Sequence, residues 1–571
     1  MIGVISKPEQ AGVAKEFFEL FKTPWEVYRP DRVYDVIIVT AHETPEVSPR
    51  LLLVYGPSEN NIDPRIGASV HRRLEGAVLT ARDTPLPIYR EMVTFADHSN
   101  GSACVAAGSE VAGIRTGSSD STVIRLGYDL FDEVEFLLSA GQPIENAHVP
   151  TLEVHIRMLR QWILEAGIPL IEIPPTPAGH SFVVCLTHDI DFVGIRNHKF
   201  DHTMWGFVYR ATVGAVRNFV RGRLSLGNLL QNWFAVGSLP FVYAGWVKDF
   251  WEPFEWYSEV EAGLPATYFL IPFKRRSGEK VPGGDASRRA AAYDVSDLPE
   301  QTTTLLKRGC ELGVHGIDSW HSADRGKSEL ARIAAVTGDT SIGIRMHWLL
   351  GDASTPAVLE QAGYAYDSTF GYNETVGYRA GTGQVFRPLG ANALLELPLH
   401  VQDGALFYPQ RLDLPEAEAE KRCRALIENA GKFGGALTLL WHDRSHAPER
   451  HWGDFYIRLV QTLRATDCWF GTASQAVDWF RKRREVRFEL METEDGSARA
   501  CPCYEGEEVV PPLNIRFHRP CQEVNGSTVS SPAASGFVDI PWNGVSRDEP
   551  EQLLQNIFLG PSEPVRAELA N

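Results

Sequence analysis

The chain has 571 residues, of which 44% are hydrophobic and 22% charged, an ordinary globular composition with room for two or three domains. Its formal net charge of -18 argues against a general nucleic-acid binder, because phosphate neutralisation needs a surplus of Lys and Arg. A neutral or cationic substrate fits this charge better.

The first residues and the cysteines of the chain indicate the cellular compartment. The first residues, MIGVISKPEQAGVAKEF, contain neither an apolar leader core nor a small-residue cleavage site, so we expect a cytoplasmic protein. Eight cysteines, mostly isolated within apolar runs, are typical of reduced core residues. Cys501 and Cys503 form a CxC without a second pair at zinc-site spacing, which favours solvated thiols over a structural zinc.

Composition divides the chain into three expected domains. Residues 1–172 alternate short apolar runs with Gly, Pro and Asp breaks and close with a helical pattern around 149–166, which predicts an N-terminal α/β domain. The Pro-rich segment IPPTPAG then leads into a second unit at 180–485. Residues 486–571 hold short strand-like pieces between Pro, Gly and Ser, and predict a small C-terminal β-rich domain.

The second unit repeats a short apolar strand that ends in polar residues. Seven segments follow this pattern: FVVCLTHDID, ATYFLIP, ELGVHGIDSWH, SIGIRMH, AYDSTFGY, LLELPLHVQD and ALTLLWHDRS. Helical patterns lie between several of them, so strands and helices alternate as a parallel barrel-like sheet requires. In such folds the active-site groups gather at the carboxyl ends of the strands, and we expect the polar residues to meet there.

The segment THDID ends the first of these strands with two carboxylates. Asp189 and Asp191 flank one residue, so on an extended strand they point the same way, while His188 and Ile190 point to the other face. Two adjacent carboxylates repel without a cation, and a divalent metal would neutralise them with imidazole as its partner. His315 and His321 follow the third strand. The plain alternative is a pair of turn or capping carboxylates and structural histidines.

These residues resemble the polysaccharide deacetylases, the NodB-homology fold of carbohydrate esterase family 4, in a divergent HDID variant. The first family motif resembles Thr187-His188-Asp189-Ile190-Asp191, and the second resembles HGIDSWH. The RMH segment is similar to a third motif that begins with Arg, and LTLLWHD to a last one that ends in His. The resemblance covers about 300 residues and implies a distorted (β/α) barrel of about seven strands.

The resemblance implies a site residue by residue. A divalent metal, expected to be Zn²⁺, is held by Asp191, His315 and His321, and polarises both a water and an amide carbonyl. The expected catalytic residues are Asp189 as general base, Arg345 to orient it, His442 from the opposite strand as the acid and Asp367 as an outer partner of either. Which of Asp189 and Asp191 is base and which is ligand stays open. His188 and His347 are expected to be outer partners or structural residues.

The segment at 195–262 is an insert between the first two strands. It is aromatic and locally basic, but neither of its apolar runs reaches the roughly 20 residues of a spanning helix. We expect a helical lid over the barrel mouth. An interfacial helix that contacts anionic lipid is the alternative.

Three functions remain after these observations. The first is a metal-dependent deacetylase that hydrolyses an N-acetyl amide on a sugar or polysaccharide precursor. The second uses the same groups on another C–N bond, such as a small cyclic amide or ureide. The third is a glycan-binding scaffold without catalysis, which the costly cluster of carboxylates disfavours.

Overall fold

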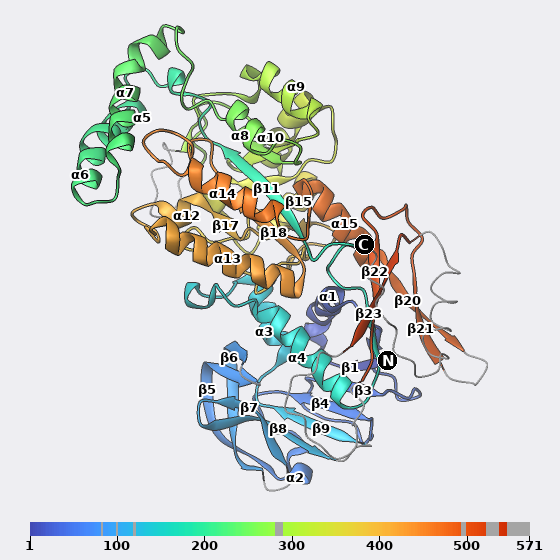
Figure 1. Ribbon diagram of the computed structural model, residues 1–571. Coiled ribbons are helices and arrows are strands. Elements are labelled where there is room, and N and C mark those ends of the chain that lie inside the picture. Colours follow the sequence, from blue (N-terminus) through green and yellow to red (C-terminus); the bar gives the residue numbers. More distant parts are fainter. Residues whose placement is uncertain are drawn as a thin grey trace, which may run out of the picture.

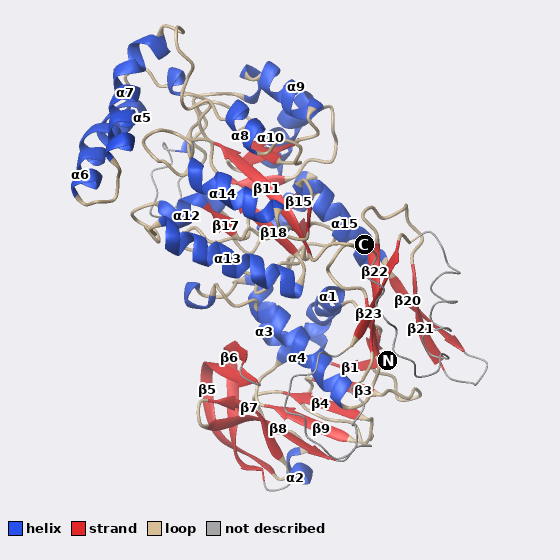
Figure 2. Cartoon of the chain, viewed as in Figure 1, coloured by secondary structure: helices blue, strands red, loops and turns tan. Residues whose placement is uncertain are grey.

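The computed structural model describes residues 1–81, 84–98, 101–117, 121–279, 289–492, 498–520 and 536–544. Over these residues the protein is a mixed α/β structure with two nine-stranded sheets, one three-stranded sheet and one two-stranded sheet (Figure 1, Figure 2). One large sheet comes from the first 126 residues, and the other contains the strand that ends in THDI.

The N-terminal sheet joins a parallel half to an antiparallel half. In spatial order, the parallel half contains β2 (Trp25–Val27), β1 (Ile2–Ile5), β3 (Val36–Val39), β4 (Leu51–Tyr55) and β9 (Thr122–Leu126). The antiparallel half contains β8 (Glu110–Gly117), β6 (Thr84–His98), β5 (Ala68–Ala81) and β7 (Ser102–Ala107). Helices α1 (Ala11–Phe21), α3 (Leu130–Ser139) and α4 (Thr151–Glu165) share its apolar core. Helix α4 is the one expected at 149–166, whereas the long β5–β6 hairpin was not predicted.

The second large sheet is entirely parallel. Its main path, in spatial order, is β16 (Leu395–Glu396), β15 (Tyr366–Asp367), β14 (Ile344–Met346), β13 (Glu311–Gly316), β12 (Thr267–Leu270), β11 (Phe182–Ile190), β18 (Ala436–Leu440) and β17 (Val401–Gln402). Strand β19 (Cys468–Phe470) also pairs with β11. The two end strands of the path, β16 and β17, do not pair with each other among the described residues, so the sheet is a half-barrel that fits the expected distorted barrel.

Each of the seven expected segments contains a strand of this sheet, and LLELPLHVQD contains two. Strand β19 was not predicted. All nine residues of β11 are buried, because helices cover the sheet and leave no water-facing side. The surrounding helices are α9 (Pro299–Lys307), α10 (Ala323–Thr337), α11 (Thr355–Ala362), α12 (Asp403–Phe407), α13 (Glu416–Phe433), α14 (Gly453–Arg464) and α15 (Ala473–Glu485).

Local sequence sets where these helices begin and end. The Ser322 hydroxyl accepts a hydrogen bond from the Arg325 N–H at the start of α10, and Thr472 forms a capping box with Gln475 at the start of α15. Helix α10 ends at Gly338, whose φ of 72° is one that other residues adopt only at a cost. These caps satisfy polar backbone groups at the starts of α10 and α15.

The insert is helical, as expected, whereas its role as a lid over the barrel mouth stays a prediction. It contains α5 (His202–Tyr209), a π-helical turn (Arg210–Gly214), α6 (Ala215–Val220), α7 (Leu226–Tyr243) and α8 (Phe254–Val260). Helices α5 to α7 project from the barrel at the end remote from the N-terminal sheet (Figure 1). Among the described residues, none of the helices has the length and apolar character needed to cross a membrane.

The C-terminal segment adds two small antiparallel sheets. Strand β20 (Arg487–Glu492) pairs with β21 (Ala498–Cys503), and β22 (Leu513–His518) lies between β23 (Phe537–Trp542) and β10 (Leu170–Glu172). The tail therefore pairs with residues that precede the barrel, and His518 Nε2 lies 2.8 Å from Glu172 Oε1 across this junction. The expected boundaries at 172, 180 and 485 stay predictions, and the tail beyond 544 lies outside the described residues.

Candidate active site

Strand β11 places the two carboxylates of THDID at its carboxyl end. Asp189 is 2% exposed, and Asp191 follows the last residue of the strand. His188 points to the other face, where its Nδ1 lies 3.0 Å from the Trp441 carbonyl oxygen and its Nε2 lies 2.8 Å from Glu261 Oε1. Both ring nitrogens of His188 are therefore engaged in the core behind the site.

A compact group of possible metal ligands forms around Asp191. Ligand atoms of Asp191, His315 and His347 all lie within 4.8 Å of one another. Asp191 Oδ1 is 3.4 Å from His315 Nε2 and 3.3 Å from His347 Nε2. His315 Nδ1 lies 3.0 Å from the Arg345 carbonyl oxygen, to which it donates, so the other nitrogen of the ring faces the carboxylate.

The atoms of this group fit a divalent metal. Asp191 Oδ1 and His315 Nε2 are buried and have no hydrogen-bond partner among the described residues. Buried polar atoms without partners are rare in folded proteins, and one carboxylate with two imidazoles is an ordinary donor set for Zn²⁺ and similar ions. Burial lowers the pKa of His347 to about 3, so this imidazole is neutral at pH 7 and keeps a lone pair for a metal.

His321, expected as a ligand, lies outside this group. Strand β13 ends at Gly316, and the chain has turned away before it reaches His321. The Nε2 atom of His321 lies 3.5 Å from Asp318 Oδ1 and 4.0 Å from Glu279 Oε2. The position expected for His321 is taken by His347, which directly follows β14 and was expected to be an outer or structural residue. Its place immediately after a predicted strand was the signal that could have found it.

Arg345 lies beside Asp189, as the sequence analysis expected. Arg345 Nη1 donates to Asp189 Oδ1 at 3.1 Å and to Thr187 Oγ1 at 2.7 Å. Its Nε and Nη2 donate to the carbonyl and hydroxyl oxygens of Ser368, both at 2.9 Å. The fully buried guanidinium therefore fixes Oδ1 of Asp189, while Oδ2 lies 3.8 Å from His315 Nε2 on the side of the metal group.

His442 reaches the same strand ends from β18. His442 was expected on the opposite strand, but β18 pairs directly with β11, with Leu440 opposite Thr187, so His442 comes from a neighbouring strand. Its Nδ1 lies 2.6 Å from Asp403 Oδ1, and its backbone N–H donates to Asp403 Oδ2 at 2.9 Å. Burial lowers the pKa of His442, but the carboxylates of Asp403, Asp191 and Asp189 together outweigh this effect and raise the pKa to about 10.

Asp403, and not Asp367, is the carboxylate that contacts His442. Asp367 accepts a hydrogen bond from the Thr369 hydroxyl, and the Thr369 oxygen in turn accepts the Met346 N–H at 3.0 Å. Burial raises the pKa of Asp367 to about 6. Asp367 thus lies on β15 and is linked to β14 through Thr369. Asp403, at the start of α12, was missed although the segment HVQD that ends in it was recognised as a polar strand end.

A fourth buried carboxylate shapes the end of β11. Asp443 accepts the Phe192 N–H at 3.1 Å and the Asp191 N–H at 3.4 Å. Burial raises the pKa of Asp443 to about 8. By holding the two peptide groups that follow the strand, Asp443 positions the side chain of Asp191.

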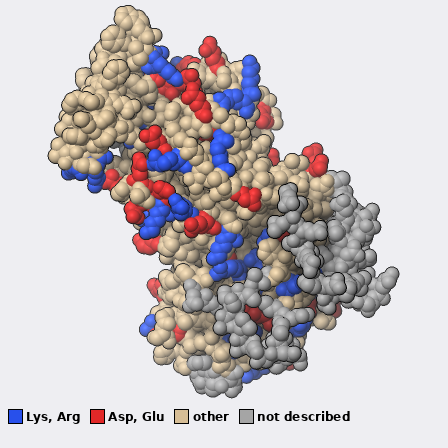
Figure 3. Space-filling view, in the orientation of Figure 1, with Lys and Arg blue, Asp and Glu red and all other residues tan. Residues whose placement is uncertain are grey.

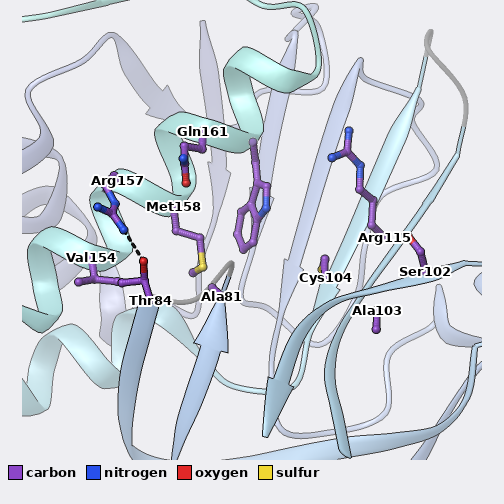
Figure 4. Close-up of a pocket in the computed structure, with 11 residues that line it drawn as sticks. Ala81, Thr84, Ser102, Ala103, Cys104, Arg115, Val154, Arg157, Met158 and Gln161 are labelled. Atoms are coloured by element: carbon purple, nitrogen blue, oxygen red, sulfur yellow. Dashed lines mark hydrogen bonds between the residues drawn. The ribbon is translucent and has the colours of Figure 1, made fainter. Parts of the chain in front are cut away.

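A separate pocket of about 230 Å³ lies in the N-terminal part, between α4 and the antiparallel strands (Figure 4). Its cationic side chains are already engaged: Arg157 Nη2 donates to Thr84 Oγ1 at 2.6 Å, and Arg115 Nη1 lies 2.7 Å from Glu165 Oε2. None of the expected site residues lines this pocket.

No family model matches the chain, and no curated protein matches it. Solved structures that are similar to it include a putative polysaccharide deacetylase from Mycobacterium smegmatis, with 19% identity, a TM-score of 0.33 and coverage of 57% of this chain and 100% of that chain. A probable polysaccharide deacetylase from Pseudomonas aeruginosa PAO1 has 12% identity, a TM-score of 0.34 and coverage of 54% and 94%. The Puue allantoinase has 13% identity, a TM-score of 0.32 and coverage of 54% and 93%.

Proposed function

We propose that the protein is a metal-dependent hydrolase that removes an N-acetyl group from a sugar or polysaccharide precursor. One observation carries the proposal. A three-residue metal group, an Arg-paired carboxylate and an Asp-paired imidazole lie together at the carboxyl ends of neighbouring parallel strands. Amide hydrolysis needs these three elements: an electrophile that polarises the carbonyl, a base for water and an acid for the amine.

The ligands of the ion are assigned to Asp191, His315 and His347, with His347 in place of His321. A divalent metal bound there supplies polarisation of the amide carbonyl and acidification of water. Asp443 and the Arg345 carbonyl group position two of the ligands through hydrogen bonds. Zinc as the metal and a cytoplasmic location are parts of the same proposal.

Asp189 is the general base in this mechanism. Its Oδ1 is occupied by Arg345, so Oδ2, on the side of the metal group, is the atom that accepts a proton from the attacking water. The hydrogen bonds of Arg345 to Thr187 and Ser368 keep the guanidinium in place, and its positive charge stabilises the carboxylate.

His442 is the general acid. Its Nδ1 is bonded to Asp403, which leaves Nε2 as the nitrogen that can give a proton to the leaving amine. A pKa of about 10 keeps the imidazole protonated at neutral pH, and the side chain is 26% exposed, so it reaches the substrate side of the mouth. Loss of the proton to the amine leaves a neutral imidazole beside Asp403, ready to be protonated again by water.

The substrate class rests on the motif resemblance, which implies an N-acetylated sugar. The test is metal analysis of the purified full chain, together with acetate release from N-acetylglucosamine oligomers and from lipid- or nucleotide-linked N-acetyl sugars. We expect about one divalent ion per chain and acetate release that chelation abolishes and added metal restores. Asp324→Asn is the matched control for carboxylate substitutions, because the side chain of Asp324 is 98% exposed.

The same experiment separates the alternatives. Ring opening of a cyclic amide or ureide without acetate release would show that the proposed substrate class is wrong and that the same site residues act on another C–N bond. Binding of glycan oligomers by a protein that holds no metal and releases no acetate would contradict the proposal and favour a scaffold.

A further inference from the structure

The helical insert has two apolar faces, of which only one is packed. The inner face is buried between α5, the π-helical turn, α7 and the segment that follows, and contains Phe207, Ala211, Ala235, Leu239, Val242 and Trp251. The outer face is exposed. Along α5 and α6 its apolar side chains recur every three or four residues, which is the spacing of one helix face: Trp205, Tyr209, Val213, Val216 and Val220.

Helix α7 continues this exposed apolar face. Leu226, Leu230, Trp233, Phe234 and Phe241 are exposed, and a groove lined by Val213, Val216, Trp233 and Val236 joins them to the first stripe. Fourteen of the 22 large apolar side chains that are exposed on the described residues lie between Phe200 and Val247. Single exposed apolar residues are normal, but such a concentration marks a surface that binds something.

The charge of this surface is opposite to that of the whole protein. Residues 195–248 contain seven Lys and Arg and one acidic residue, Asp201, in a chain whose net charge is -18. In Figure 3 the projecting part of the insert, helices α5 to α7 at upper left, is almost free of acidic atoms and has Lys and Arg atoms at its lower edge. Arg217 and Arg221, both exposed, form no ion pair with any residue that the structure describes.

We propose that this face of the insert docks on the surface of a membrane that contains anionic phospholipids. Exposed Trp and Tyr beside Arg are the side chains that favour the interface between lipid headgroups and acyl chains, where the rings enter the boundary and the cations meet phosphates. A second copy of the chain fits less well, because a two-fold contact would bring two surfaces of the same positive charge together. The rest of the acidic chain is repelled by such a membrane, so the insert meets it first.

The base of the insert connects this surface to the candidate active site. Asp249 accepts the N–H groups of Ile195 at 3.1 Å and Arg196 at 3.0 Å, which clamps the two ends of the insert together four residues after Asp191. The Arg444 guanidinium lies 3.7 Å from the centre of the Phe192 ring and 4.8 Å from that of the Trp251 ring, and so ties this base to the loop that follows β18. Docking through the insert therefore holds the strand ends at a fixed position relative to the bilayer.

The test is flotation of the full chain with vesicles of phosphatidylcholine alone and of phosphatidylcholine with phosphatidylglycerol at about 7:3. We expect binding to the anionic vesicles only, weakened at high salt. Arg217→Gln with Arg221→Gln should lower the partition coefficient by about thirtyfold, because each cation near an anionic surface contributes about a fivefold factor. Trp233→Ser with Phe234→Ser should lower it at least as much, with unchanged metal content.

The control variants remove exposed apolar or cationic side chains outside the insert. Val33→Ser with Val510→Ser and Arg29→Gln with Arg424→Gln change exposed side chains outside the insert and should bind vesicles like the wild type. Absence of vesicle binding, equal binding to neutral and anionic vesicles, or insert variants that bind like the wild type would overturn the proposal. A dimer in light scattering that the Trp233→Ser and Phe234→Ser variant dissociates, without vesicle binding, would assign the face to a second copy. Because vesicle binding needs no turnover, these outcomes are independent of the proposed hydrolase activity.

Discussion

Both large sheets have polar side chains at the carboxyl ends of parallel strands, but the two groups of side chains differ in their interaction partners. In the N-terminal sheet, Lys7 Nζ lies 2.8 Å from Asp129 Oδ2, and Arg125 Nε donates to Asp63 Oδ1 at 2.8 Å. Gln10 completes the first of these networks by donating to Asp129 at 3.0 Å. In the barrel, by contrast, Asp191 Oδ1 and His315 Nε2 are buried and lie 3.4 Å apart, and neither has a hydrogen-bond partner among the described residues.

The difference shows what distinguishes a binding site from a structural network. Carboxylates occur at the strand ends of both sheets, so carboxylates alone do not decide. A network in which each carboxylate already has its cation gains nothing from a metal, whereas atoms left without partners carry a desolvation cost that a ligand can remove.

The largest effect is expected for Asp191→Asn. The amide oxygen is a weaker ligand than the carboxylate, so the protein should lose its metal and its acetate release should fall below detection. Chelation should lower the melting temperature of the wild type and leave that of the variant unchanged, because a ligand stabilises only a protein that binds it. Metal analysis and thermal unfolding measure both results, and full metal occupancy in the variant would contradict the assignment.

Asp189→Asn should show whether Asp189 acts as the general base and not as a metal ligand. The variant should keep its metal and lose turnover by roughly 10²–10⁴-fold, the contribution of a positioned general base. Metal content and kcat measured on the same preparation check the prediction. If Asp189→Asn loses the metal and Asp191→Asn keeps it, the roles of the two carboxylates are exchanged.

Asp63→Asn, beside the N-terminal sheet, should lower stability and leave metal binding and activity unchanged. Removal of one partner leaves the fully buried Arg125 without its counter-charge, so the unfolding free energy should fall by about 3–5 kcal/mol while metal content and kcat stay unchanged. Arg65→Gln, at an exposed position two residues away, is the matched control and should leave stability within about 0.5 kcal/mol. Urea unfolding measures the difference; a loss of metal in Asp63→Asn would show that the two sheets are coupled.

Asp403→Asn should change the pH dependence of the reaction. A general acid works while it is protonated, so activity is lost as pH rises through the pKa of His442, which is about 10 in the wild type. The Asp403 charge is the largest of the carboxylate effects that raise this pKa, so its loss should lower the pKa and move the basic limb of kcat/KM to lower pH. Ser445→Ala removes a hydrogen bond to Asp403 but keeps its charge, so its limb should move less. An unchanged pH profile of kcat/KM in Asp403→Asn would contradict the assignment of His442 as the general acid.

The parallel sheet could be predicted from the sequence because each strand is a continuous apolar run that ends in polar residues. The alternation in THDID also placed Asp189 and His188 on opposite faces. The β5–β6 hairpin gave no such signal, because most of the described side chains of β5 lie at least partly exposed and no apolar run marks the strand. Asp403 was missed because it meets His442 only through the pairing of a two-residue strand, β17, with β18.

The candidate metal ligands show the limit of spacing as a guide. His315 and His321 lie in the same predicted segment, and this short spacing led to the prediction that both are ligands. The fold instead brings His347 from the next strand, with His315 and Arg345 in register on neighbouring strands. After His347 the backbone turns sharply, with positive φ of 66° at Trp348 and 52° at Leu349, so the histidine stays at the strand end while the chain leaves it.

His321→Ala and His347→Ala form the closing pair of predictions, with the smallest effect expected for His321. Its imidazole is 19% exposed and lies beside Asp318, a carboxylate that already pairs with Arg325 at 2.8 Å, so its removal should change stability by no more than about 0.5 kcal/mol. Metal content and acetate release should stay within about twofold of the wild type, a change below 0.5 kcal/mol. His347→Ala, which removes the same ring from a buried position 3.3 Å from Asp191, should lose the metal as Asp191→Asn does. The reverse pattern, with metal lost in His321→Ala and kept in His347→Ala, would restore His321 as a ligand and require the loop at Asp318 to close on Asp191 when the ion binds.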